Sequence, residues 1–371
     1  MTNTFEYVVP CLFGLEGPAA DELRRMGIEN VRAENGRVRF SGDGLACAKA
    51  NLRLRAGERV LLCLGGFEAR TFDQLFEGVK ALPLSDFIPR DGQFPVKGYC
   101  LDSALHSVPD CQRIIKKAAA VNLGQAYRTQ WLAETGAMYQ LQFSIIKDHA
   151  ELYLDTTGAP LFKRGYRPGH VAAPLRETLA AALVGFARYR GRDALWDPFC
   201  GSGTIPIEAA LTAHNRAPGL NRPFSAQEWS FIPKAAWRDA AEEARALEYP
   251  GPYHIFASDI DPKAVALARE NAKRAGVSQD ITFSVADARQ APAPWEAGVI
   301  VCNPPYGERM LERKEAQSLY QDVGRALGRL PDWKSYIISS EPDFERFYGR
   351  PAAKRRKLYN GMILCYLNMY Y

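Results

Sequence analysis

The sequence predicts an α/β protein in which an open, mostly parallel sheet follows one or two small α+β units. The first observation is length, because 371 residues exceed what one hydrophobic core usually serves. The second is the alternation of strand and helix patterns from residue 195 to residue 339, which is typical of a parallel sheet covered on both faces. The third is a series of shorter strands and helices before residue 155. We therefore expect at least two domains.

The front part begins with a strand, a helix and a hairpin. Residues 4–13 have the apolar pattern of a strand, and residues 17–26 favour a helix that Gly27 ends. Asn35-Gly36 accepts the positive φ angles of a tight turn, which predicts a hairpin over 31–40. The remaining elements are expected as strands at 60–64, 93–100, 139–146 and 150–154 and a helix at 111–124.

A linker and a new domain are expected next. Residues 156–169 are rich in Gly, Pro and basic side chains, which favours a linker. Pro174 suits the first turn of a helix that continues to Phe186 and ends before Gly191. Residues 214–252 are longer than a normal connection, so we expect a partly helical insertion with a function of its own. The alternating elements are strands at 195–196, 254–257, 281–285, 299–302 and 336–339, and helices after Gly203, at 262–275 and at 319–330.

Charge and cysteine content narrow the class of protein. A net charge of +5 is mildly basic and fits a polyanionic partner without requiring one. The basic clusters at 164–167 and 354–357 are equally compatible with a solvated face. The eight cysteines form no C-x-x-C pair or zinc spacing, so we expect reduced thiols and no metal. No apolar run approaches the roughly 20 residues that span a bilayer, and the N-terminus has no signal-peptide pattern. We expect a cytoplasmic protein without a membrane partner.

Four loops that follow predicted strands carry the candidate site, because ligands of such sheets bind beyond the carboxyl ends of the strands. The first loop runs from Asp197 to Thr204, where glycines let the backbone approach a ligand and a helix N-terminus follows. The second loop contains Asp259, the third Asp287, and the fourth is Asn303-Pro304-Pro305-Tyr306. Pro206 stands where a dinucleotide-binding turn has its third glycine, so that fingerprint is incomplete.

In this order, the four loops resemble those of class I methyltransferases that act on exocyclic amines of nucleic acids. Three segments, 161–167, 173–179 and 303–309, are similar to the THUMP-containing RNA guanine-N2 methyltransferases, especially the bacterial enzymes that modify 23S ribosomal RNA. The resemblance covers nearly the whole chain. It is strongest over 158–310 and again at 354–365, and looser over 1–60.

The resemblance implies three domains and a cofactor. We expect a ferredoxin-like unit at 1–60, a THUMP RNA-binding domain at 61–157, and a Rossmann-like methyltransferase domain with a mostly parallel seven-stranded sheet at 158–371. The implied cofactor is S-adenosylmethionine, with Asp259 on its ribose hydroxyls and Asp287 on its adenine amino group. Asp261 is expected to cap a helix instead. The residues implied around the methionine end are Asp197, Pro198, Cys200, Gly201, Ser202, Gly203, Thr204 and Thr178.

The residue types of the fourth loop suit transfer of a methyl group to an amine. An exocyclic amine is a poor nucleophile because its lone pair is delocalised into the ring. Acceptors at the Asn303 side-chain oxygen and the Pro304 carbonyl would favour the geometry of attack, while Pro305 fixes the backbone and Tyr306 stacks on the base. The sulfonium leaves as a neutral sulfide and the methylated amine becomes acidic, so no catalytic histidine is needed.

The implied partner is structured RNA, either 23S ribosomal RNA or an assembling large ribosomal subunit. Transfer RNA guanine N2 and adenine N6 in DNA or RNA remain alternatives, because the fourth loop serves either amine. A non-catalytic RNA-binding assembly factor is the alternative of another class. The candidate RNA contacts are Lys97, Arg113, Lys116, Lys117, Arg128, Arg164, Tyr166 and Arg167.

Overall fold

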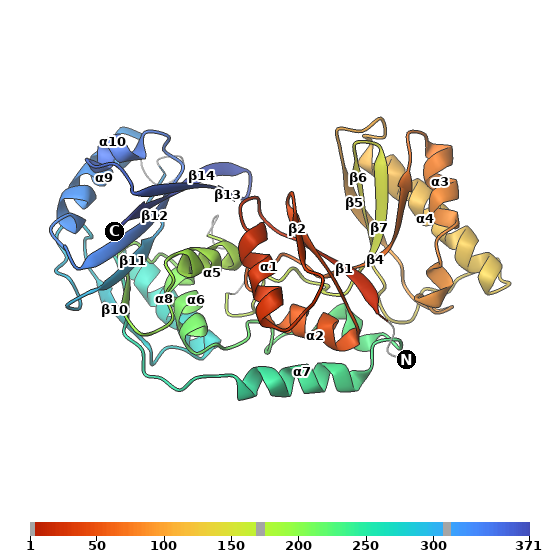
Figure 1. The fold of residues 1–371 in the computed structure, drawn as a ribbon, viewed down its shortest axis with the longest axis horizontal. Helices are drawn as coiled ribbons and strands as arrows, with labels where there is room; N and C mark the ends of the chain where they lie inside the picture. The colour runs from red at the N-terminus through yellow and green to blue at the C-terminus, as the bar shows by residue number, and fades with distance from the viewer. Residues whose placement is uncertain (1–3, 168–174, 307–312) are drawn as a thin grey trace.

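The computed structural model describes residues 4–167, 175–306 and 313–371, and these residues form two seven-stranded sheets. Figure 1 shows the second sheet at the left, the first strands at the centre and strands β4 to β7 at the right. The first sheet has the order β2-β3-β1-β4-β7-β6-β5. Its strands are β1 (Phe5–Pro10), β2 (Arg32–Glu34), β3 (Arg37–Gly42), β4 (Leu61–Glu68), β5 (Val96–Leu101), β6 (Leu141–Ile146) and β7 (His149–Asp155).

The first sheet is continuous across both front units. Strand β1 pairs with β3 on one side and with β4 on the other, where Tyr7 lies opposite Leu62. The predicted hairpin is confirmed as β2 and β3, and Gly36 has the expected positive φ of 72°. The helices of this part are α1 (Glu16–Arg25), α2 (Gly44–Arg53), α3 (Phe72–Lys80), the short η1 (Leu84–Asp86) and α4 (Val108–Ala126).

The expected linker begins as part of the core. Thr156 and Thr157 are fully buried, and the Asn51 amide donates to Thr156 Oγ1 over 2.9 Å. The Thr157 hydroxyl accepts from the Val60 N–H over 2.8 Å. The prediction of a linker at 156 is therefore wrong at its first residues, because these threonines satisfy polar groups between α2 and the start of β4.

The second sheet confirms the mostly parallel prediction. Its order is β10-β9-β8-β11-β12-β14-β13, with parallel pairing from β10 through β12 and antiparallel pairing of β14 and β13. The strands are β8 (Ala194–Asp197), β9 (Ile255–Asp259), β10 (Ile281–Val285), β11 (Gly298–Cys302), β12 (Trp333–Ser339), β13 (Lys354–Asn360) and β14 (Ile363–Tyr370). The helices are α5 (Glu177–Phe186), α6 (Thr204–Ala213), α8 (Pro262–Ala275), α9 (Arg313–Leu327) and α10 (Phe344–Tyr348).

The insertion contains η2 (Ser225–Glu228) and α7 (Lys234–Ala246), and it reaches both front units. Figure 1 shows α7 running beneath α2. Glu243 on α7 pairs with Lys49 at 2.6 Å and with Arg53 at 3.0 Å, both on α2. The Trp229 indole stacks on Tyr139 with ring centroids 5.1 Å apart. The insertion thus fastens the second sheet's domain to the first sheet.

Some predicted features lie outside the described residues, namely Pro174 with the first residues of segment 173–179, and residues 307–309 of the fourth-loop segment.

Candidate active site

The first predicted loop forms a tight turn between β8 and α6. The Asp197 carboxylate accepts the Phe199 N–H at 3.0 Å. Burial of this carboxylate raises its pKa well above the usual range, although the hydrogen bond acts in the opposite direction. The Cys200 N–H donates to the Ser258 carbonyl at 2.9 Å. Gly203 has φ +83°, and a Cβ there would lie 2.9 Å from the Ala268 Cβ. Only glycine suits that place, so α6 can start close against α8.

Asp259 ties the second loop to the first. Its Oδ2 accepts the Gly201 N–H over 2.9 Å, and its Oδ1 accepts the Asp261 N–H over 3.0 Å. Asp261 accepts the Lys263 N–H at 2.9 Å, which confirms its predicted role as the N-cap of α8. Asp259 therefore holds the glycine turn whether or not a ribose is present.

Asp287 follows β10 and is engaged by a neighbour. Its two carboxylate oxygens accept from the Arg289 guanidinium at 2.6 to 2.9 Å, and this hydrogen bonding holds the Asp287 pKa below its usual value. The Arg289 backbone N–H also donates to Asp287 Oδ1 at 2.9 Å, so a further donor would have to share this carboxylate with Arg289.

Asn303 is the most telling residue of the fourth loop. Its side-chain Oδ1 is shielded from solvent and has no hydrogen-bond partner within the described parts of the chain. A buried acceptor without a donor costs about 1–3 kcal/mol, so such a group calls for an explanation. An incoming amine would supply the missing donor.

The rest of that loop is held by neighbouring elements. The Tyr320 hydroxyl on α9 donates to the Pro305 carbonyl at 2.6 Å. The Tyr306 ring packs against the core, and its hydroxyl lies 3.6 Å from Cys365 Sγ on β14. Burial raises the pKa of the Tyr306 phenol well above its usual value, so the phenol stays neutral.

These loops converge because of the strand order. Strands β9, β8 and β11 are parallel neighbours, so their carboxyl ends, at Asp259, Asp197 and Cys302, meet at one edge of the sheet. The predicted turn and the Asn303 loop therefore lie at the same edge of the second sheet.

The sequence did not indicate the hairpin beside this site. Asn360 and Cys365 belong to β13 and β14, which flank Tyr306. The available signal was the Asn360-Gly361 turn dipeptide, followed by the mostly apolar run from Ile363 to Tyr370.

Arg164 and Tyr166 are wrongly predicted as RNA contacts. Both side chains are buried, and Glu208 on α6 accepts from the Tyr166 hydroxyl at 3.0 Å and from Arg164 at 3.4 Å. Arg164 also donates to the Arg55 carbonyl at 2.8 Å. These polar groups are hydrogen-bonded inside the protein, where RNA phosphates have no access.

Arg167 and Thr178 also face the domain junction. Arg167 pairs with Glu177 at 2.6 Å and donates to Thr204 Oγ1 at 3.3 Å. The Thr178 hydroxyl donates to Glu58 at 2.6 Å. Arg167 thus contacts the first residue of α6, next to the glycine turn, and its guanidinium is engaged inside the protein instead of forming the predicted RNA-binding surface.

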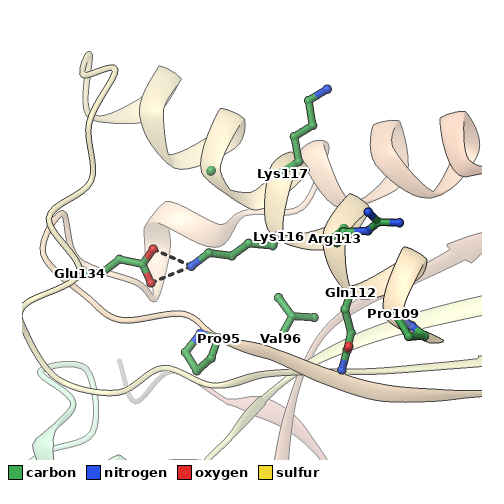
Figure 2. Close-up of a pocket in the computed structure, with 9 residues that line it drawn as sticks. Pro95, Val96, Pro109, Gln112, Arg113, Lys116, Lys117 and Glu134 are labelled. Carbon is green, nitrogen blue, oxygen red and sulfur yellow. Dashed lines mark hydrogen bonds and ion pairs between the residues drawn. The ribbon is translucent and has the colours of Figure 1, made fainter.

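Three candidate RNA contacts of the front part, Arg113, Lys116 and Lys117, line a groove between α4 and the edge strand β5, about 910 Å³ in volume (Figure 2). Lys116 pairs with Glu134 at 2.6 Å and lies 3.4 Å from the centre of the Phe94 ring. Lys97 is exposed on β5, outside the lining of the groove, and Arg128 is exposed just after α4. The groove is lined by Pro95, Val96, Pro109, Gln112, Arg113, Lys116, Lys117, Ala120 and Glu134.

The fold and the site define the class of protein, and comparison with known proteins agrees. Residues 164–368 match the RMKL-like methyltransferase domain, residues 6–61 the RlmL ferredoxin-like domain and residues 69–155 the THUMP domain. The chain is a THUMP-containing class I methyltransferase, and it belongs to the RlmL-like family.

Two curated proteins illustrate this relationship. The chain is 46% identical to "Putative RNA methyltransferase YpsC" of Bacillus subtilis over 94% of this chain and 91% of that protein. It is 32% identical to the "Ribosomal RNA large subunit methyltransferase K/L" of Psychromonas ingrahamii over 98% of this chain. The match covers 50% of that relative, so this chain spans about half its length.

Two solved structures share the whole fold. A "predicted N6-adenine-specific DNA methylase" from Listeria monocytogenes has a TM-score of 0.93 and 44% identity, covering 100% of this chain and 96% of that one. SMU.472, "a putative methyltransferase complexed with SAH", has a TM-score of 0.94 and 37% identity, covering 100% and 99%. That complex agrees with S-adenosylmethionine as the cofactor.

We searched for membrane-spanning helices and metal-binding groups within the described ranges 4–167, 175–306 and 313–371. No helix there is long and apolar enough to cross a bilayer. The same residues contain no group of His, Cys, Asp and Glu side chains suited to hold a metal ion.

Proposed function

We propose that this protein transfers a methyl group from S-adenosylmethionine to the exocyclic N2 amine of a guanine in 23S ribosomal RNA. The observation that carries the proposal is the buried, unpartnered Oδ1 of Asn303 at the carboxyl edge of the second sheet. The relatives named as RNA methyltransferases support RNA as the substrate.

The cofactor is proposed to lie along the loops that end β8, β9 and β10. The backbone of Asp197, Pro198, Cys200, Gly201, Ser202, Gly203 and Thr204 would hold the methionine end, with Thr178 nearby. Asp259 would accept from the ribose hydroxyls and Asp287 from the adenine amino group. When bound, S-adenosylmethionine supplies an electrophilic methyl group on a sulfonium. The glycine turn fits this ligand because backbone with positive φ brings N–H groups close to it.

The chain's own contribution is to position the amine. Asn303 Oδ1 and the Pro304 carbonyl would accept the two amine hydrogens and aim the nitrogen lone pair. Pro305 stays fixed by its hydrogen bond with Tyr320, and the Tyr306 ring would stack on the base. Placement of this kind supplies up to roughly 7–11 kcal/mol of rate enhancement in favourable cases.

RNA is proposed to bind the front sheet through Lys97, Lys116 and Lys117. Arg113 and Lys117 are one helical turn apart on α4 and line the same groove, where Arg113 is already paired with Asp110. Lys116 is already paired with Glu134, so we expect Lys97 and Lys117 to contribute more to phosphate binding.

The rival substrates share the same chemistry. Guanine N2 in transfer RNA and adenine N6 in DNA or RNA present a similar amine to Asn303. The Listeria monocytogenes relative is described as an N6-adenine-specific DNA methylase. A non-catalytic assembly factor would need neither the glycine turn that fits the cofactor nor an amine acceptor at Asn303.

Mapping of methylated bases separates these substrates. Ribosomal RNA, transfer RNA and DNA are isolated from cells with and without the gene, and their modified nucleosides are sequenced. We expect one N2-methylguanosine in 23S ribosomal RNA to disappear with the gene. Loss of a methyl group only from transfer RNA or DNA would contradict the proposal.

A further inference from the structure

The tip of the β13–β14 hairpin presents a fully exposed methionine. Asn360 pairs with Ile363, so Gly361 and Met362 form a two-residue turn, and Gly361 has the positive φ of 65° that such turns require. Met362 is 97% exposed, more than any other large apolar side chain of the described residues. A single exposed methionine needs no explanation by itself, so its position has to carry the argument.

That position is beside the fourth loop of the active site. The side chains of Asn360 and Cys365 both approach the Tyr306 hydroxyl, so the two strands of the hairpin flank this residue. Met362 comes two residues after Asn360, which is at most about 7 Å along the chain. The turn that carries Met362 therefore adjoins the strand ends that flank Tyr306, the residue proposed to stack on the base.

The hairpin also borders the front sheet. Figure 1 shows β13 reaching from the second sheet toward α1 and β2. The Tyr359 ring lies 6.0 Å from the Phe13 ring, and the Lys357 carbonyl lies against Gly14. Lys354 and Lys357 are exposed on the same strand and add positive charge. An RNA held by the front sheet would pass this tip on its way to Asn303.

We propose that Met362 is a wedge that enters the RNA helix when the target guanine leaves it. This inference rests on the proposed function and adds to it that the target guanine is base-paired in the free RNA. Extrusion of a base leaves a gap in the stack, and apolar side chains fill such gaps in other nucleic-acid complexes. Tyr306 would receive the base while Met362 occupies the place it leaves.

The test compares Met362→Ala with wild type on two RNA probes. The first probe is an unmodified 23S ribosomal RNA transcript, on which the methylated guanine is mapped with labelled S-adenosylmethionine. The second is the same transcript with a substitution that removes the pairing partner of that guanine. We expect the variant to be about tenfold slower on the first probe, as loss of an apolar contact predicts, and within about twofold of wild type on the second.

Two variants serve as controls. Met362→Leu keeps an apolar side chain and should retain most of the rate on the first probe. Leu247→Ala truncates another exposed apolar residue, which lies just after α7 and outside the β13–β14 hairpin, and should change neither rate. Because Met362 is exposed, its truncation should leave the melting temperature and the affinity for S-adenosylhomocysteine unchanged.

Three results would overturn the wedge alone: an undiminished rate of Met362→Ala on the first probe, an equal loss on both probes, or a mapped guanine that is already unpaired. Absence of methylation by wild type on both probes would overturn the proposed function, and the wedge with it.

Discussion

Tyr306 has two proposed roles: its ring stacks on the base, and its hydroxyl holds the residue against the β13–β14 hairpin. The hydroxyl meets Cys365 and Asn360, and the ring packs against the core in a residue that stays partly exposed, so we propose that a base stacks on the exposed part. Removal of the hydroxyl should therefore matter less than removal of the ring.

We expect Tyr306→Phe to keep the methyl-transfer rate within about threefold, and Tyr306→Ala to lower it by about 10- to 100-fold, as loss of base stacking predicts. Rates with a 23S ribosomal RNA transcript measure this. Because the pKa of the phenol is raised well above 10, wild type and Tyr306→Phe should have the same pH profile up to about pH 10. A wild-type rate that changes near pH 10 while the variant's stays constant would show that the phenol ionises during the reaction.

Single residues were predictable from sequence where their role is local. Asp261 caps the helix that starts one residue later, so neighbouring letters sufficed. Arg164 and Tyr166 were mispredicted because their partner, Glu208, lies on another element. A basic and aromatic cluster looks the same in a linear sequence whether it faces RNA or a buried carboxylate.

Among the elements, the segment around Arg167 connects the domain junction to the glycine turn between β8 and α6. The Arg167 guanidinium bridges Glu177 on α5 and Thr204 at the start of α6. Arg222, in the insertion, holds the same segment differently, because it donates to the Pro160 and Lys163 carbonyls and does not reach Thr204.

We expect Arg167→Ala to weaken binding of S-adenosylhomocysteine by about tenfold, since loss of a charge-assisted hydrogen bond is worth roughly 1.5–3 kcal/mol. Isothermal titration calorimetry measures the affinity. The matched variant Arg222→Ala should lower the melting temperature while leaving this affinity within about twofold. Equal affinities of the two variants would mean that Arg167 only stabilises the junction.

Elements with strong periodicity were predicted, and those defined by distant pairing were not. The helix at 262–275 and the hairpin around Gly36 follow from apolar spacing and turn chemistry. Strand β13 carries charged and polar residues at most positions because it is an edge strand, whereas β14 is largely apolar. The place of β14 comes from its antiparallel pairing with β12, and the place of β13 from its pairing with β14, which the local sequence does not specify.

At the scale of the whole molecule, the insertion determines how the RNA-binding and catalytic parts are joined. Trp229 is buried against Tyr139, and its indole N–H donates to the Met138 carbonyl at 2.8 Å. The contacts of Trp229 and Glu243 show that the insertion joins the second sheet's domain to the first sheet, and a function of its own remains a prediction from its length.

We expect Trp229→Ala to destabilise the protein by about 3–5 kcal/mol, as loss of a large buried aromatic residue predicts. Methylation of RNA should fall more than affinity for S-adenosylhomocysteine, because the THUMP unit loses its orientation while the cofactor turn keeps its contacts. Thermal unfolding and calorimetry, run below the melting temperature, measure both. An equal fall in both quantities would argue for general unfolding.

The central claim is that Asn303 aims a guanine amine at the methyl group. A single-turnover reaction of wild type and Asn303→Ala with labelled S-adenosylmethionine and 23S ribosomal RNA, followed by digestion and mass spectrometry of the nucleosides, tests it most directly. We expect N2-methylguanosine from wild type, and a rate lower by about 10²–10³ from the variant with its affinity for S-adenosylhomocysteine unchanged. A variant that methylates at the wild-type rate, or a wild-type product other than N2-methylguanosine, would contradict it.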